Sequence, residues 1–468
     1  MPLRLLSSNI DTMQDEIPFS HLTKTFQDAI IACRRLGIHY LWADSLCIIQ
    51  DSNQDWEEQC VMMSQVYSNS YCNIAAAHAR DGSFGCFARR DPATVQPLHV
   101  DLNWGHSPGA HYVVWTRYWT ERVLETPLNM RAWVFQERTL APRNLFFGAT
   151  EAFFECLENR ASEHFPVQIP RQVGTAVLRG IRPHIDGPLI RETLGLEPDQ
   201  SLDALSLWGH LVERFSLGRL TYATDKLVAL SAIASEMQGH IQSDYLAGMW
   251  RRHLGCQLLW DVRGIQWLVQ RSRPRVFVAP SWSWASVVGV VQNACSVRFA
   301  DDRGIIIEIL DAQINLANPK NHFGQVIGGF LRVRGSLAKS RVLMQKSPSG
   351  SEFLYLSISK GASSSVVFDN AQENSTAIGE EFYLLPIQHL PRDKEVIQTG
   401  MSIAVYHTSG IILRQTCPSK EEYIRVGKFE EFGDLEEFQS ACRQTASWTG
   451  DGEEAADGWG PKRVLTVL

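Results

Sequence analysis

The chain has 468 residues, more than one hydrophobic core usually supports, so two or three domains are expected. Its net charge of −7 at pH 7, with no run of basic residues, argues against binding to a nucleic-acid phosphate backbone. No stretch approaches the roughly 18 to 20 apolar residues of a membrane span. The ten cysteines show no Cys-x-x-Cys pair and no zinc-ligand spacing, which predicts no metal site and a reducing, cytoplasmic setting.

Helical and extended patterns alternate along residues 1–160. Apolar residues recur at helix spacing over 25–37, which predicts a helix. Residues 38–43 form a nearly unbroken apolar run, which we interpret as a strand buried on both faces of a parallel sheet. The expected elements after it are a helix from Asp55, strands at 71–77, 111–116 and 144–154, and a short helix at 129–139. This order predicts an α/β domain with a mostly parallel sheet.

Two further parts are expected behind this domain. Residues 161–270 carry apolar residues mainly at helix spacing, which predicts a mainly helical segment. Over residues 271–468, short β-branched and aromatic runs alternate with turns from 275–278 onward. Such runs predict a β-rich C-terminal module. Its acidic end, 430–457, is expected to form a solvated helix followed by a mobile tail.

Four separated blocks of sequence carry a family resemblance when they are taken together. In chain order they are Thr25–Asp51, which ends in LWADSLCIIQD; Asp55–Arg90; Arg131–Arg143, which holds RAWVFQER; and Leu220–Ala285, which ends in PSWSWA. In this order and spacing they resemble the fungal heterokaryon incompatibility (HET) family. Members of that family often carry segments like the fourth block behind the HET domain.

The chain departs from the family's pattern in two places. HET domains usually open with a strand that carries a Ser-Tyr-x-Trp-Gly-like element, and this element is absent before residue 25. The domain is therefore identified as a member that lacks its N-terminal strand. The helix that begins near Asp55 usually carries a glutamate at the position of Gln59. A carboxamide cannot ionise, so Gln59 cannot act as a carboxylate base.

The resemblance implies a role in allorecognition between fungal strains, in which the domain triggers programmed cell death. A distant similarity of the family to TIR domains implies NAD-consuming activity, with NAD as a substrate and no bound cofactor. Cleavage of a glycosidic bond needs a carboxylate that supports an oxocarbenium-like transition state. Asp44 and Glu137 are the candidates for that catalytic role. Arg131, Arg138 and Arg143 are the candidates for binding a pyrophosphate.

Each of these side chains also has a purely structural interpretation. Asp44 would cap the turn that follows it, and Glu137 would pair with a neighbouring arginine. A non-enzymatic signalling module that binds protein partners or self-associates is therefore the main alternative, and a truncated, inactive family member is another. No P-loop, dinucleotide-binding glycine motif or nucleophile elbow occurs in the sequence.

Overall fold

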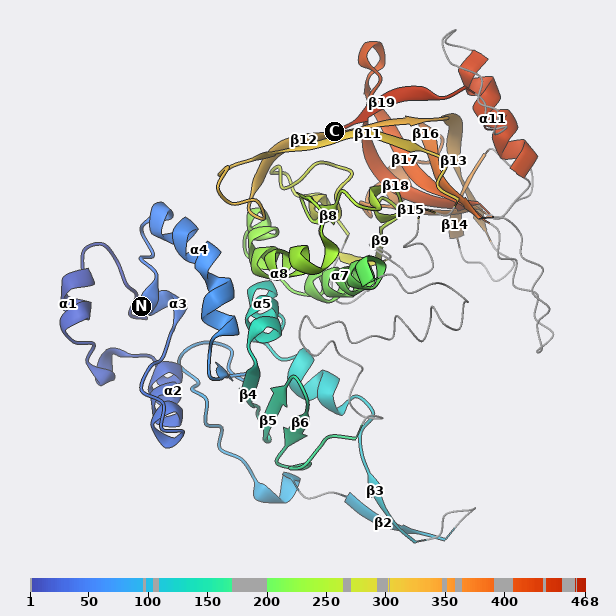
Figure 1. Cartoon of the computed structure of the whole chain (residues 1–468). Helices are drawn as coiled ribbons and strands as arrows, with labels where there is room; N and C mark the ends of the chain where they lie inside the picture. Colours follow the sequence, from blue (N-terminus) through green and yellow to red (C-terminus); the bar gives the residue numbers. More distant parts are fainter. Residues whose placement is uncertain are drawn as a thin grey trace. The chain divides into compact units, whose positions relative to one another are not determined.

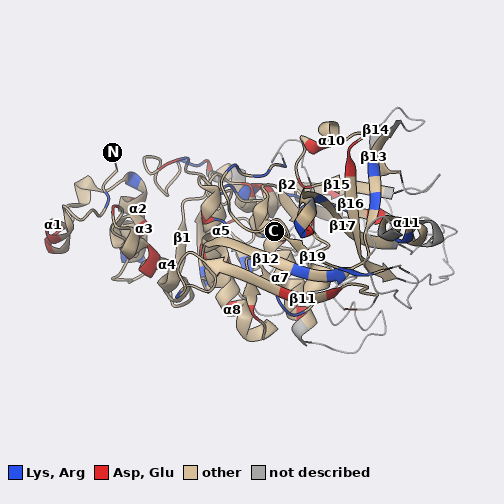
Figure 2. Ribbon diagram, turned by 90° about the horizontal axis from the view of Figure 1, so that it is seen from above, with Lys and Arg blue, Asp and Glu red and all other residues tan. Residues whose placement is uncertain are grey.

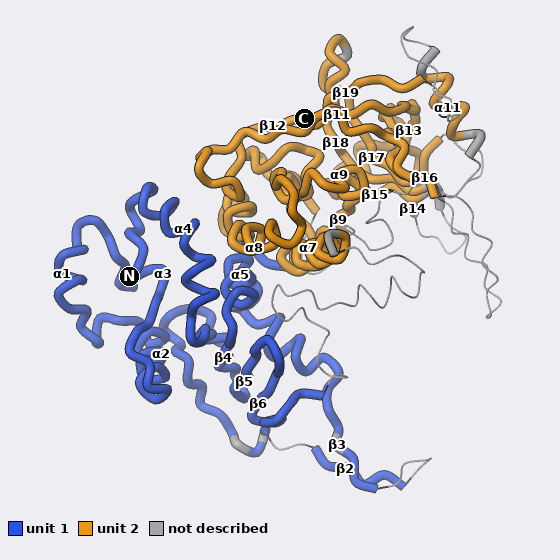
Figure 3. Tube along the Cα trace, viewed as in Figure 1, with its two compact units in different colours: residues 1–184, 218–220 blue, residues 185–217, 221–468 orange. Residues whose placement is uncertain are grey.

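A computed structural model shows the chain as two compact units, residues 1–184 with 218–220 and residues 185–217 with 221–468 (Figure 3). We call them unit 1 and unit 2. The structure describes residues 2–95, 98–103, 109–170, 200–263, 271–292, 302, 304–346, 352–357, 364–390, 407–431, 435–447, 459 and 461–468.

Unit 1 combines helices with a small sheet (Figure 1). Its helices are α1 (Ile10–Asp15), α2 (Lys24–Arg35), α3 (Asp44–Cys47), α4 (Asn53–Ser68) and α5 (Ala132–Leu140). Its strands are β1 (Asn73–Ala75), β2 (Leu98–Leu102), β3 (Gly109–Val113), β4 (Arg143–Phe147), β5 (Ala152–Cys156) and β6 (Arg160–Ser162). Buried aromatic residues, Trp119, Phe146 and Phe153 among them, form a core against the sheet.

The helices expected near the N-terminus are confirmed. The first is α2, which begins at Lys24 after its N-cap Thr23, whose hydroxyl accepts the N–H of Phe26 at 3.5 Å. The second is α4, which begins after Ser52, whose Oγ accepts the N–H of Asp55 at 3.2 Å. Side-chain oxygens at these positions satisfy N–H groups that have no partner within the helix.

The strand predicted at residues 38–43 is wrong. This stretch is irregular, its Tyr40 side chain is 91% exposed, and it leads into the single turn of α3. The apolar side chains of this segment line a pocket instead of pairing in the sheet. The run LWADSLCIIQD is therefore no central strand, although its apolar residues have a role in the fold.

The described strands of unit 1 do not form the mostly parallel sheet that the sequence predicted. Their order is β1-β4-β5-β6, and β1 runs parallel to β4, whereas the pairs β4–β5 and β5–β6 are antiparallel. The link from β4 to β5 spans only residues 148–151. So short a connection can join antiparallel neighbours but cannot cross over to a parallel one.

Asp28 fixes a loop of unit 1 to α2. Its buried carboxylate accepts the N–H groups of Cys86 at 2.9 Å and Phe87 at 3.3 Å, and it pairs with Lys24. Gly85 has a φ of +81°, and a Cβ there would lie 2.4 Å from the carboxylate. Burial by itself would raise the pKa of Asp28, but the lysine and the backbone donors outweigh it and hold this pKa below its ordinary value.

We expect Asp28→Ala to lower the free energy of unfolding by about 2 kcal/mol near pH 7, because two N–H groups lose their acceptor. The depressed pKa makes this contribution present above the pKa of the unfolded carboxyl and lost as the pH falls through the folded value. Urea denaturation at several pH values measures both effects. The exposed Asp15→Ala is the control, with a change within about 0.5 kcal/mol. Equal stability of the two variants at pH 7 would contradict the prediction.

Unit 2 is β-rich, as expected for the C-terminal region (Figure 1). Its helices are α7 (Gln200–Ser216), α8 (Ser231–Ile241), α9 (Leu254–Gln257), α10 (Glu373–Thr376) and α11 (Leu435–Ser447). Its shorter strands are β7 (Tyr245–Leu246), β8 (Met249–Trp250), β9 (Asp261–Arg263) and β10 (Val290–Gln292). The strands of its main sheet are β11 (Glu308–Leu316), β12 (Val326–Gly335), β13 (Ala338–Lys346), β14 (Glu352–Leu356), β15 (Ser364–Phe368), β16 (Glu381–Leu390), β17 (His407–Cys417), β18 (Glu422–Glu431) and β19 (Arg463–Val467).

The main sheet runs in the order β11-β12-β19-β18-β17-β16-β13-β14, with β15 paired to β18. The expected strand at 275–278 is absent, since these residues have no strand conformation. The expected acidic helix is α11, whose Phe438 and Cys442 pack with Phe429 of β18. Residues 448–458, where the mobile tail was expected, lie outside the described part. Beyond them the chain returns to the sheet as β19.

Charged side chains of opposite sign lie beside each other on this sheet. Figure 2 shows basic positions on β12 next to acidic positions on β11, and Arg334 contacts Glu308 at 2.6 Å. Exposed pairs of this kind contribute little to stability. Among the described helices, none has the length and apolar character needed to cross a membrane.

Buried tryptophans in unit 2 converge on one carbonyl. The indole N–H groups of Trp208 and Trp284 donate to the oxygen of Gly248 at 3.0 and 2.6 Å. Gly248 has a φ of +95°, and a Cβ there would lie 2.8 Å from the indole of Trp284. Any other residue at this position would be strained and would displace the ring.

We expect Gly248→Ala to lower the free energy of unfolding by about 2–3 kcal/mol, through backbone strain and displacement of the indole. Gly239→Ala is the matched control, because Gly239 lies inside α8 and a Cβ there meets nothing within 4 Å. Alanine favours the helix there by about 0.5–1 kcal/mol. Chemical denaturation of both variants tests whether the free energy of unfolding falls in Gly248→Ala and rises in Gly239→Ala. A Gly248→Ala protein as stable as the wild type would refute the role of this glycine.

Candidate functional site

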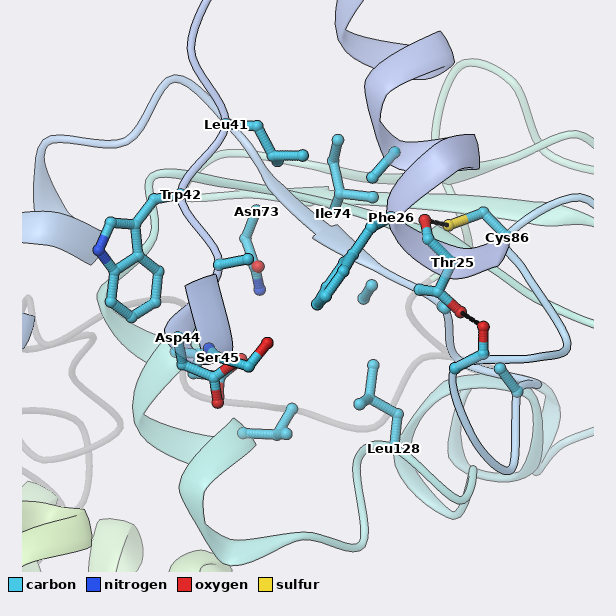
Figure 4. Close-up of a pocket in the computed structure, with 18 of the residues that line it drawn as sticks. Thr25, Phe26, Leu41, Trp42, Asp44, Ser45, Asn73, Ile74, Cys86 and Leu128 are labelled. Atoms are coloured by element: carbon cyan, nitrogen blue, oxygen red, sulfur yellow. Dashed lines mark hydrogen bonds between the residues drawn. The ribbon is translucent and has the colours of Figure 1, made fainter. Parts of the chain in front are cut away.

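A pocket of about 760 Å³ lies within unit 1. Its walls come from α2, the irregular segment 38–43, the start of α3, the end of α4, strand β1 and helix α5. Figure 4 shows Phe26 from α2 between Asp44 and Ser45 on one side and Thr25 and Cys86 on the other. Apolar side chains thus line much of the pocket, with polar groups gathered near α3 and α5.

Asp44 is the first residue of α3 and lines this pocket. Its Oδ1 accepts the backbone N–H of the next residue, Ser45, at 2.7 Å, a local contact within the same turn. The backbone of this turn is held in place, because the carbonyl of Ser45 accepts the N–H of Leu5 at 2.9 Å. Asp44 nevertheless remains exposed, and Figure 4 shows it beside Ser45 at the edge of the cavity.

Glu137 of α5 lines the same pocket and has an unusual protonation equilibrium. Burial raises the pKa of Glu137 to about 7, and the negative charge of Asp44 acts in the same direction. Arg131 and a hydrogen bond from Tyr67 oppose this shift and favour the ionised form. As a residue, Glu137 is half-buried. Near neutral pH the Glu137 carboxyl is therefore divided between its protonated and ionised forms.

The three arginines predicted to bind a pyrophosphate lie in different surroundings. Arg131, just before α5, is exposed and lines the pocket. Arg138 also lines it, but its guanidinium forms two hydrogen bonds to Glu155, at 2.6 and 2.9 Å. Arg160 contacts the same carboxylate at 2.9 Å. Arg138 is therefore part of an ion pair with Glu155, whereas Arg131 is the arginine whose charge acts on Glu137.

Arg143 is not among the residues that line the pocket. It begins β4, donates to the carbonyl of Tyr71 at 3.2 Å, and lies over the Tyr71 ring. The structure therefore brings Asp44, Glu137, Arg131 and Arg138 to one cavity but leaves Arg143 outside it.

Gln59 also lies away from this cavity. It is not one of the lining residues, and its amide donates to Asp55 at 3.4 Å within α4. Tyr67, two turns further along the same helix, does line the pocket. Sequence reasoning did not include Tyr67 among the candidate site residues. A polar group at the tip of a buried aromatic ring is the signal that would have indicated it.

This arrangement combines two carboxyl groups of different environment with a cationic side chain. The ionised Glu137 can accept a proton, whereas the negative charge of Asp44 can stabilise a developing cation. Among the described residues, no group of three His, Cys, Asp or Glu side chains could hold a metal ion. The chemistry that the site offers is that of carboxylates.

Fold and site together define a two-unit protein with a carboxyl-lined pocket in its mixed α/β unit. Residues 5–137 match the model of the family described as Heterokaryon incompatibility protein (HET). The matched segment is thus similar to a heterokaryon incompatibility domain, and it includes both Asp44 and Glu137. No curated protein and no solved structure matches the chain.

Proposed function

We propose that the chain is a fungal cell-death effector whose HET domain hydrolyses the glycosidic bond between nicotinamide and ribose in NAD. The observation that carries the proposal is the meeting of Asp44 and Glu137 in one pocket, with the pKa of Glu137 raised to about 7. The choice of NAD as the substrate rests on the distant similarity of the family to TIR domains. The proposed setting is the cytoplasm, with protein partners or self-association providing the trigger.

In the proposed reaction the bond between ribose and nicotinamide breaks, and its electron pair returns to the pyridinium nitrogen. Nicotinamide leaves as a neutral molecule, and the negative charge of Asp44 stabilises the cation that forms on the ribose. A water molecule then adds to this cation and yields ADP-ribose, while its proton passes to the ionised Glu137. Arg131, exposed to the pocket, supplies the charge for the pyrophosphate of the substrate.

The organisation that we propose for the chain is a HET domain over residues 1–160, a mainly helical segment over 161–270, and a β-rich module over 271–468. The alternative function is a module that binds a partner through this pocket without chemistry. The local hydrogen bond that the Asp44 carboxylate accepts from the N–H of Ser45 supports that alternative. An assay of turnover separates the two functions.

The test is to incubate the purified full-length chain with NAD and to follow nicotinamide and ADP-ribose together. The expected result is equal release of both products by the wild type, with strong losses in Asp44→Asn and Glu137→Gln. The exposed Glu16, outside the pocket, provides the control variant Glu16→Gln, which keeps the wild-type rate. No turnover by the folded wild type would overturn the enzymatic proposal. Undiminished turnover in both pocket variants would reject the assignment of the site.

A further inference from the structure

Tyr67 contacts both of the chain segments that carry the candidate carboxyls. It lies in the last turn of α4 and is only 8% exposed. Its ring meets the ring of Trp42 edge-on, with centroids 5.6 Å apart and planes at 77°. Trp42 precedes Asp44 by two residues, so this aromatic contact lies directly before the first carboxyl.

Tyr67 and Glu137 of α5 line the same pocket. The Tyr67 hydroxyl lowers the pKa of Glu137 by hydrogen bonding, which favours the ionised carboxylate. The two helices also contact each other elsewhere, since Trp56 of α4 packs edge-on against Trp133 of α5 with centroids 6.5 Å apart.

The segment that Trp42 belongs to needs such an anchor. Residues 38–43 form no ladder with another strand, and they are tied at their two ends. At one end the N–H of Ile38 donates to Cys33 at 2.9 Å, and at the other the carbonyl of Ser45 accepts from Leu5 at 2.9 Å. Between these ends, the contact of Trp42 with Tyr67 holds the segment against α4.

We propose that Tyr67 is the positioning residue of the pocket: its hydroxyl orients the Glu137 carboxyl, and its ring holds the Asp44 segment through Trp42. This inference rests on the proposed function for its catalytic consequence, but its structural content stands apart from any reaction. The two parts of one side chain thus have separable roles. Removal of the hydroxyl alters Glu137, and removal of the ring releases the Asp44 segment.

The direction of the first effect follows from the groups around Glu137. Asp44 of α3 and burial favour its protonated form, whereas Arg131 and the Tyr67 hydroxyl favour its ionised form. Arg138, which also lines the pocket, is paired with Glu155. Loss of the hydroxyl removes a hydrogen bond to the charged form, so we expect the pKa of Glu137 to rise by about one unit in Tyr67→Phe.

The experiment compares Tyr67→Phe and Tyr67→Leu in the full chain. The control is Tyr118→Phe, because Tyr118 is equally buried in unit 1 and its hydroxyl lies 2.7 Å from Ser162, outside the pocket. The protonation midpoint of Glu137 is measured as the infrared carboxylic-acid band that is lost in Glu137→Gln. Hydrogen–deuterium exchange measures how firmly the segment 38–47 is held. Neither readout needs turnover.

Tyr67→Phe is expected to raise the infrared midpoint and to leave the exchange of 38–47 unchanged, since the ring remains. Tyr67→Leu is expected to raise the midpoint and to accelerate that exchange. If NAD is turned over, the alkaline shift appears in the pH profile of kcat/KM for Tyr67→Phe. In the same assay, kcat falls by about tenfold or more in Tyr67→Leu, because the Asp44 segment is misplaced.

An unchanged midpoint in folded Tyr67→Phe would overturn the role of the hydroxyl. Unchanged exchange in folded Tyr67→Leu would overturn the role of the ring. If Tyr67→Leu does not fold, the phenylalanine variant still decides the first part, and Trp42→Leu, which removes the other side of the ring contact, decides the second. A wild type without turnover but with these shifts would refute the proposed reaction and leave the positioning role intact.

Discussion

Arg425→Met is expected to lower the free energy of unfolding by about 3–5 kcal/mol, the largest stability loss predicted for this chain. Arg425 of β18 is 0% exposed, and its guanidinium donates to the carbonyls of Leu258 at 2.6 Å and Trp260 at 2.5 Å. Its Nε contacts Asp369 at 3.2 Å, and the group stacks on the Trp260 ring at 3.3 Å. Methionine fills similar space but leaves these acceptors without their donor.

The charge itself is retained in the folded state. Burial lowers the pKa of Arg425 to about 10, although Asp369 acts in the opposite direction, so the side chain remains a cation near neutral pH. After the substitution Asp369 keeps one partner, since Arg273 contacts it at 2.9 Å. An aspartate that loses the charge of Arg425 inside a core remains costly.

Denaturant titration of the full chain measures this effect. Arg334→Met is the matched control, because Arg334 makes an ion pair of good geometry on an exposed part of the same sheet. Its loss is expected to change the stability by less than about 1 kcal/mol. If Arg425→Met is as stable as Arg334→Met, the hydrogen bonds and ion pair of Arg425 make no net contribution to the stability of the fold.

Glu137→Gln is expected to reduce NAD hydrolysis at neutral pH by about 10² or more, the contribution typical of a general base. The wild-type rate should rise with pH around a midpoint near the Glu137 pKa of about 7, because the ionised form accepts the proton. A glutamine in this position has nearly the same shape but cannot accept that proton. Initial rates of nicotinamide release over a range of pH values measure both the size of the loss and the midpoint.

Asp44→Asn tests the direction in which the pH midpoint of the rate moves. Because the negative charge of Asp44 raises the pKa of Glu137, its removal should move the midpoint to lower pH while the maximal rate falls. Tyr67→Phe should move it in the opposite direction. A midpoint that moves upward in Asp44→Asn would mean that a group other than Glu137 controls the rate.

The pH dependence of stability also reports on the protonation of Glu137. Its folded pKa is raised above that of the unfolded chain, so the folded state binds the extra proton between these values. Stability from this group is therefore full at low pH and is lost as the pH rises through about 7. Glu137→Gln should flatten that part of the dependence of Tm on pH, a result that requires no turnover.

Much of the secondary structure could be predicted from local patterns in the sequence. The helices α2 and α4 were predictable because apolar spacing acts within one stretch of chain, although their N-caps, Thr23 and Ser52, came from the structure. The β-rich character of unit 2 was predictable for the same reason, from its β-branched runs. The three arginines in one sequence block illustrate the limit, since Arg131 lines the pocket and Arg143 does not. Their separation follows from a strand that starts at Arg143 itself.

The sequence by itself indicated the similarity of residues 5–137 to the heterokaryon incompatibility family, the candidate carboxyls Asp44 and Glu137, and the helices around them. Only the tertiary structure decided that residues 38–43 line a pocket, because strand pairing requires a distant partner that no local pattern reveals. The tertiary structure also decided the protonation of Glu137. Its pKa depends on burial and on Asp44 and Tyr67, which reach it from elsewhere in the chain.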